Sequence, residues 1–259
     1  MQITRHALSI LVSGLLLLAA VPHAVAQTQA RKKPGAVASA TAKTKTLPSM
    51  TPVKTGKPES VPESAPSPKS PAAPNAAIAP EEILEYHAQP AGVRKLIESG
   101  LALAGQNLTY KFGSADPANG GLDCSGFIYY VLRQHGLTQV PRDSSGLYLW
   151  ARKARGFRAV ISRKPDSPEM DELLPGDLLF WIGTYATDHD PPVTHTMIYL
   201  GTEKSSGAKI MIGSSDGRTY RGQRRNGVSV FDFTMPRTSI EAEQRATFIG
   251  YARIPGLRD

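Results

Sequence analysis

The clearest pattern in the second half of the chain is a series of short apolar segments separated by turn residues. Within each segment the apolar residues either alternate with other residues or follow one another without interruption. Both patterns, over so few positions, are typical of β-strands. The predicted strands cover residues 177–181, 195–200, 209–212, 227–231 and 247–253.

A helical spacing precedes these strands. Its apolar side is formed by Phe127, Ile128, Tyr130, Val131 and Leu132. Asp123 stands where a helix N-cap is expected, and Gly136 is a typical C-terminal signal. The pattern therefore predicts a mostly buried helix, with Cys124 in its first turn.

The N-terminus has the pattern of a secretory signal. An apolar run from Ile10 to Val21 follows Arg5, and small residues at 24–26 suit cleavage after Ala26. An uncleaved membrane anchor is the alternative, but it needs about 20 apolar residues, and this run is shorter. We therefore expect residues 1–26 to be removed and the chain to be exported to the periplasm or cell envelope. No later segment is apolar enough to span a membrane.

Residues 27–80 differ sharply in composition from the rest. They are rich in Ala, Pro, Lys, Ser and Thr and contain no aromatic residue, which predicts a disordered linker. This stretch has eight Lys or Arg against two Glu, so it accounts for most of the chain's net charge of +8. The remaining residues 81–259 are nearly neutral and form one predicted domain. Nucleic acid is therefore not an expected partner, whereas a loose attraction of the linker to anionic envelope polymers is physically reasonable. A solvated linker without a partner is at least as reasonable.

The chain has a single cysteine, Cys124, which cannot form an internal disulfide. In an oxidising compartment a lone cysteine indicates either burial as an inert residue or chemistry. The start of a helix favours chemistry, because free backbone N–H groups and the helix dipole stabilise a thiolate and lower the thiol pKa.

A cysteine hydrolase also needs a residue that accepts and returns protons, and histidine is the usual one. His195 begins a predicted strand, which would hold its ring firmly. His189 lies in a proline-flanked loop and is the second candidate. The other four histidines belong to the signal, lie near the linker or follow the far end of the Cys124 helix.

Four blocks of the sequence, in order, resemble the NlpC/P60 family of cell-wall cysteine peptidases. They are Asp123-Cys124-Ser125-Gly126-Phe127, Val140-Pro141-Arg142-Asp143-Ser144, the segment from Leu174 to Phe180 and the segment from His195 to Gly201. The resemblance covers about residues 110–220. It implies a papain-like α+β fold, in which a helix that begins with the nucleophile packs on an antiparallel sheet.

The resemblance also implies a function. Family members typically hydrolyse peptidoglycan stem peptides, often between γ-D-glutamate and a diamino acid, with Cys124 as nucleophile and His195 as base. In a subgroup that binds a free amino terminus, residues equivalent to Tyr110, Asp123 and Ser125 form the pocket. Their ordinary alternatives are a core tyrosine, a helix cap and a first-turn serine. The implied chemistry needs no metal or other cofactor, and we expect a monomer.

The pattern departs from the family at the third catalytic position. A polar residue on the strand after the histidine usually orients the imidazole ring, and here that position falls at Gly213. Ser214 continues the alternation of Ile210 and Ile212 and is our candidate for the role. Ser215, Asp216, a carbonyl or a water are alternatives. This departure leaves open a working peptidase, an amidase or acyltransferase on the same scaffold, and a wall-binding member without activity.

Two long segments and one cluster of arginines lie largely outside these motifs, and the first segment, residues 142–172, is rich in Arg and Lys. We expect residues 142–172 to form a long connection and residues 182–194 a second loop. Four arginines, at 218, 221, 224 and 225, follow the strand at 209–212. They could contact acidic stem-peptide groups, and a solvated face is the simpler interpretation.

Overall fold

The computed structural model describes residues 71–164, 166–235 and 246–258. The predicted signal and residues 27–70 of the predicted linker lie outside these residues. Within them, three α-helices are α1 (Ala91–Ala104), α2 (Cys124–Gln134) and α3 (Ser144–Lys153). Single turns of 3-10 helix are η1 (Pro80–Glu82), η2 (Tyr86–Ala88), η3 (Pro117–Asn119) and η4 (Pro168–Met170).

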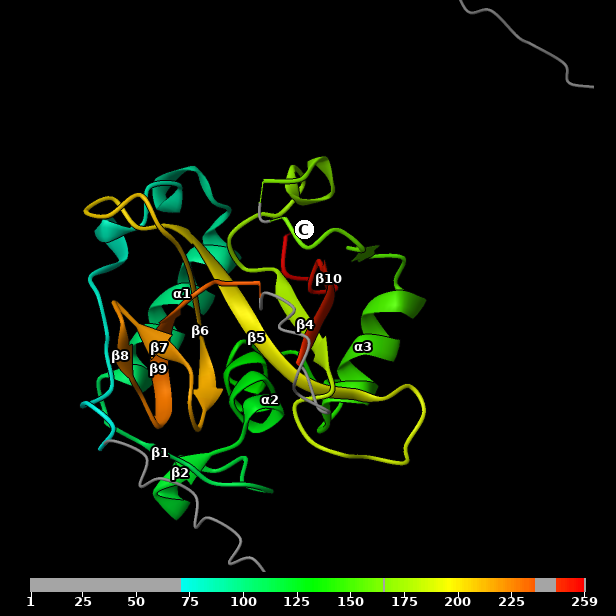
Figure 1. The fold of residues 1–259 in the computed structure, drawn as a ribbon, viewed down its shortest axis with the longest axis horizontal. Helices are drawn as coiled ribbons and strands as arrows, with labels where there is room; N and C mark the ends of the chain where they lie inside the picture. Colours follow the sequence, from blue (N-terminus) through cyan, green and yellow to red (C-terminus); the bar gives the residue numbers. More distant parts are fainter. Residues whose placement is uncertain (1–70, 165, 236–245, 259) are drawn as a thin grey trace, which may run out of the picture. The chain divides into compact units, whose positions relative to one another are not determined.

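A six-stranded antiparallel sheet forms the centre of the domain (Figure 1). Its strands, in spatial order, are β3 (Phe157–Ala159), β10 (Thr247–Ala252), β4 (Leu178–Ile182), β5 (Val193–Thr202), β6 (Lys209–Ser215) and β9 (Gly227–Asp232). Two short pairs flank it: β1 (Thr109–Tyr110) with β2 (Gly121–Leu122), and β7 (Thr219–Tyr220) with β8 (Gln223–Arg224). The α+β fold with an antiparallel sheet agrees with the prediction.

The two faces of the sheet bury different sets of side chains. Alternate residues of β5 and β6, such as Ile198 and Ile212, join a core with α1, α2 and α3. The intervening residues, such as Met197 and Met211, join a second core with Trp181 and several phenylalanines. Because these strands are buried on both sides, several of them appear in the sequence as nearly uninterrupted apolar runs.

All five predicted strands and the Cys124 helix are present, with ends shifted by a few residues. The expectation of a long connection at 142–172 is wrong, because this segment contains α3, β3 and η4. The Asp143 side chain accepts a hydrogen bond from Gly146 N at 2.8 Å and so caps α3. Leu147 and Ala151, four residues apart, form its buried side.

The predicted linker boundary at residue 80 also needs correction. Residues 73–76 already bind the domain: Ala73 N donates to Arg224 O at 2.9 Å, and Val230 N donates to Ala76 O at 2.8 Å. The Asn75 amide donates to Leu108 O at 2.8 Å. The folded part therefore begins before residue 80, because main-chain pairing holds a segment whose composition alone does not predict order.

In the described part of the chain, no helix combines the length and apolar character that a membrane span requires.

Candidate active site

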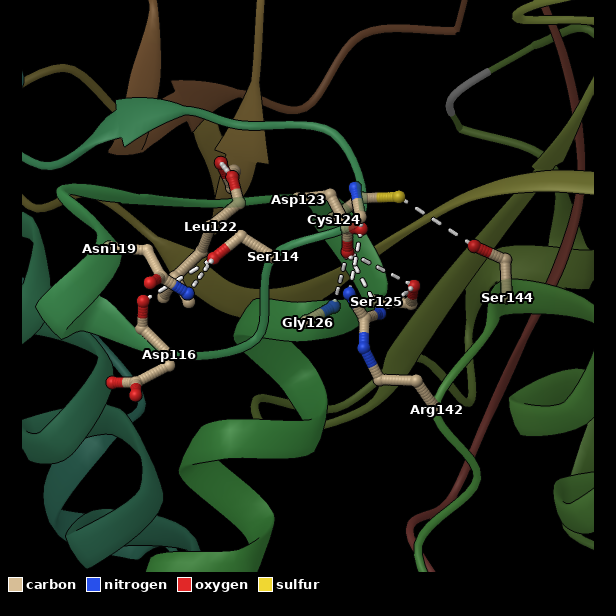
Figure 2. A network of polar contacts seen from close by, with 12 residues as sticks. Ser114, Asp116, Asn119, Leu122, Asp123, Cys124, Ser125, Gly126, Arg142 and Ser144 are labelled. Atoms are coloured by element: carbon tan, nitrogen blue, oxygen red, sulfur yellow. Dashed lines mark hydrogen bonds and ion pairs between the residues drawn. The ribbon is translucent and has the colours of Figure 1, made fainter.

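Cys124 lies at the start of α2, as predicted. The Asp123 side chain caps the helix by accepting a hydrogen bond from Gly126 N at 2.6 Å (Figure 2). The Ser114 loop runs against this first turn and accepts a hydrogen bond from Asp123 N at 3.0 Å. A Cβ atom at residue 126 would lie 2.0 Å from Ser114 O, so only glycine allows the loop to approach so closely.

Arg142 binds the two polar residues that flank the cysteine. It donates to both Asp123 carboxylate oxygens, at 3.1 and 2.8 Å, and to Ser125 Oγ at 3.0 Å (Figure 2). Asp123 also accepts from Gly113 N at 2.8 Å. Both of its oxygens are thus engaged within the protein, and a substrate amine would compete with Arg142 there. A role for Asp123 and Ser125 in amine binding stays a prediction.

The Cys124 thiol is buried and contacts α3 and β5. Its Sγ lies 3.6 Å from Ser144 Oγ and within hydrogen-bonding reach of the Thr196 backbone N–H. Burial raises the pKa of the thiol above its ordinary value, and this outweighs the lowering by the Ser144 hydroxyl and by backbone N–H groups. The expectation of a lowered thiol pKa is therefore wrong for this structure, because desolvation of the thiolate is a larger effect than the stabilisation by N–H groups at the helix start.

His195 lies on β5, directly before Thr196, whose backbone N–H contacts the Cys124 thiol. It pairs with Trp181 on β4, and the two ring centroids are 5.6 Å apart. Burial, and after it the charge of Arg218, holds the pKa of the imidazole well below its ordinary value, so the ring is neutral at pH 7. His195 Nε2 is buried without a hydrogen-bond partner among the described residues.

Ser214 does not occupy the role predicted for it. Its hydroxyl is fully buried and donates to Leu122 O at 2.6 Å, so it connects β6 to β2. Ser214 alternates with Ile210 and Ile212, whose side chains lie on the sheet face covered by the helices. His195 alternates with Met197 and Tyr199, whose side chains lie on the opposite face. At Gly213 an added Cβ would lie 3.1 Å from Met197 Cε, so the methionine fills the space beside this glycine.

Two adjoining cavities border these residues. The first, which we call the Cys124 cavity, is also lined by Asp123, Ser125 and His189. The second, the His195 cavity, measures about 770 Å³ and is also lined by Asp216 and Arg218. Tyr110, Phe112 and Tyr185 line both cavities. Tyr110 therefore lies beside the site, as predicted.

The second histidine candidate also reaches the site. His189 is exposed in the loop before β5, and its Nδ1 lies 3.1 Å from Ser145 Oγ and 2.9 Å from Pro191 O. The structure adds two residues that the sequence did not single out, Ser144 beside the thiol and Arg142 on Asp123. Both belong to residues 140–144, one of the four sequence blocks that resemble the family. Membership of that block was the signal that could have identified them as site residues. Among the described residues, no cluster of three or more His, Cys, Asp or Glu is arranged to hold a metal ion.

A cysteine at the start of a helix packed on an antiparallel sheet, with a histidine on the contacting strand, is the arrangement of the papain-like class. Residues 107–228, which include both Cys124 and His195, match the sequence model of the NlpC/P60 family.

Known proteins that are similar to the chain include a bacterial hydrolase and a protein of known structure. Gamma-DL-glutamyl hydrolase of Bacillus subtilis (strain 168) is 28% identical over 146 residues, which is 54% of this chain and 30% of that protein. The chain thus matches less than a third of the relative's length. A crystal structure from Staphylococcus aureus, described as similar to a lipoprotein of the NLP/P60 family, is 22% identical. It covers 69% of this chain and 43% of that one, with a TM-score of 0.40.

Proposed function

We propose that this protein is an exported cysteine hydrolase that cleaves peptidoglycan stem peptides. The family match and the similarity to a protein named Gamma-DL-glutamyl hydrolase support a hydrolase of this kind. The name of that relative also favours a γ-glutamyl linkage as the bond that is cut. The signal-like residues 1–26 and the basic stretch that follows favour action in the cell envelope.

The observation that carries the proposal is the contact of the Cys124 thiol with the strand that bears His195. Because its pKa is depressed, His195 is neutral and able to accept a proton. It takes the thiol proton as Sγ attacks the scissile carbonyl, and returns it to the leaving amine as the carbon–nitrogen bond breaks. Water then hydrolyses the thioester. The Cys124 N–H, which has no intrahelical acceptor, is placed to stabilise the oxyanion.

A second candidate function is binding of wall peptides without turnover. It is favoured by the lack of a partner for His195 Nε2 among the described residues, and by Met197 beside Gly213. Among the described residues no group orients the imidazole through Nε2, and the ring packs against Trp181.

Digestion of purified muropeptides by residues 27–259 tests the proposal. We expect stem-peptide fragments from the wild-type chain and none from Cys124→Ala or His195→Ala. His189→Ala is the matched control, because His189 lines the Cys124 cavity but is exposed and lies outside the strand. Binding without cleavage by the wild-type chain would favour the second candidate. A larger loss for His189→Ala than for His195→Ala would reassign the base.

A further inference from the structure

The four arginines that follow β6 differ in their surroundings. Arg221 pairs with Glu203 at 2.8 Å, Arg224 donates to Asp216 O at 2.7 Å, and Arg225 donates to Gln223 Oε1 at 2.9 Å. The fourth, Arg218, accepts a hydrogen bond from Arg225 N at its backbone carbonyl, but its guanidinium makes no hydrogen bond or ion pair with any described residue. The basic cluster seen in the sequence is therefore three arginines with acceptors and one without.

Arg218 lies at the reactive end of the sheet. Its guanidinium carbon is 4.3 Å from the centre of the Trp181 ring, and its side chain lines the His195 cavity. Stacking on an indole orients a guanidinium and leaves the N–H groups at its edge free to donate. The charge of Arg218 also acts on both His195 and Cys124, so it lies within close electrostatic range of the reacting groups.

The environment of Arg218 favours an anion. Burial lowers the pKa of its guanidinium to about 10, which leaves it charged at neutral pH. A partly buried cation without a counter-charge is unfavourable, and a carboxylate matches the paired N–H groups of arginine. Asp216 lines the same cavity, but no ion pair joins it to Arg218. The guanidinium is thus available to a ligand carboxylate.

We propose that Arg218 binds a carboxylate of the substrate in the His195 cavity and so makes the enzyme selective for anionic peptides. This inference rests on the proposed function, since it names the substrate group that the same site recognises. A bound carboxylate also offsets the repulsion between Arg218 and a proton on His195. His195 then becomes a stronger base when the substrate is in place.

Two substrate groups have this chemistry: the α-carboxylate of the γ-linked glutamate, and the terminal carboxylate of the residue that leaves. Four versions of the tripeptide Ala-γ-D-Glu-Lys separate them, with each carboxylate either free or converted to an amide. Binding is measured by calorimetry with the Cys124→Ala chain, so the result does not depend on turnover. Cleavage of the same peptides is measured with the chain that retains Cys124.

We expect one of the two carboxylates to strengthen binding about 10- to 100-fold relative to its amide, as for other charge-assisted bidentate contacts. Arg218→Gln should abolish that preference and leave affinity for the amide unchanged. Arg224→Gln, which removes the same charge nearby, should retain the preference. Melting temperatures of both variants check that they fold.

Three results would overturn the inference. They are equal binding of all four peptides, binding of none, and a carboxylate preference that survives Arg218→Gln. Failure of the proposed function looks different. In that case the carboxylate preference and its loss in Arg218→Gln would be observed, but no peptide would be cleaved by the chain with Cys124 intact.

Discussion

At the scale of single residues, burial sets the protonation of both reactive side chains. It raises the pKa of the Cys124 thiol and lowers that of the His195 imidazole, so both groups are neutral at pH 7. A thiolate–imidazolium pair would need both shifts to be reversed. In the proposed mechanism, proton transfer therefore accompanies the attack of Cys124. The protonated thiol also resists oxidation at rest, because the thiolate is the form that oxidises readily.

The raised thiol pKa predicts the pH profile of alkylation by iodoacetamide. Because a raised pKa keeps the thiol protonated to higher pH, the rate constant should rise at a pH above the midpoint of free cysteine. The midpoint is the quantity to compare, since burial also slows access. Ser144→Ala should move it higher still, because the Ser144 hydroxyl lowers the pKa of Cys124. A midpoint at or below that of free cysteine would contradict this account.

At the scale of elements, the site depends on the close approach between the first turn of α2 and the Ser114 loop. The Asp123 cap, the Arg142 ion pair and the glycine at 126 all act at this junction. The junction holds the thiol against α3 and β5. A change that moves the helix start is therefore expected to affect both the stability of the domain and the proposed catalysis.

Gly126→Ala tests the importance of this junction. The new methyl group would lie 2.0 Å from the Ser114 carbonyl, and backbone atoms cannot move aside cheaply, so we expect a loss of about 3 kcal/mol in unfolding free energy. Gly105→Ala, at the end of α1, is the control, because its methyl group would meet Ala102 O at 3.5 Å, an ordinary contact. Urea denaturation compares the two. Equal stability of both variants would show that the junction tolerates displacement.

At the scale of the whole molecule, the folded unit includes residues that the composition assigns to the linker. The main chain around Ala76 binds β9, and Arg225 Nη1 donates to Pro74 O. Through these contacts, residues N-terminal to the predicted domain boundary pack against the sheet. They also satisfy the Val230 N–H and part of the Arg225 guanidinium, which would otherwise lack these partners.

We accordingly expect residues 81–259 alone to be less stable than residues 71–259. Loss of the Pro74 and Ala76 hydrogen bonds leaves buried groups without acceptors, which corresponds to about 2 kcal/mol. Thermal denaturation of the two chains measures the difference. Equal melting temperatures would mean that residues 71–80 contribute nothing to folding.

The sequence predicted the strands and the Cys124 helix because their apolar residues follow regular periods. It did not predict α3, where only Ser144, Leu147 and Ala151 are buried and basic residues obscure the pattern. Cys124 was found as the single cysteine, in the first turn of a predicted helix, and His195 as the histidine that begins a predicted strand. The free guanidinium of Arg218 was not distinguishable from its three neighbours, because only the fold decides which arginine meets an acceptor. Ser214 was chosen by alternation, which gives the face of a strand but not the face on which His195 lies.

The contact between Gly213 and Met197 has a consequence for engineering this domain. Installing an imidazole-orienting side chain at 213 requires space that the methionine occupies, and shortening Met197 alone leaves a void in the second core. Each substitution is costly by itself, while the two together compensate in volume. Their effects are therefore expected to be strongly non-additive, and a library of single variants would discard both members of a combination that a paired library would recover.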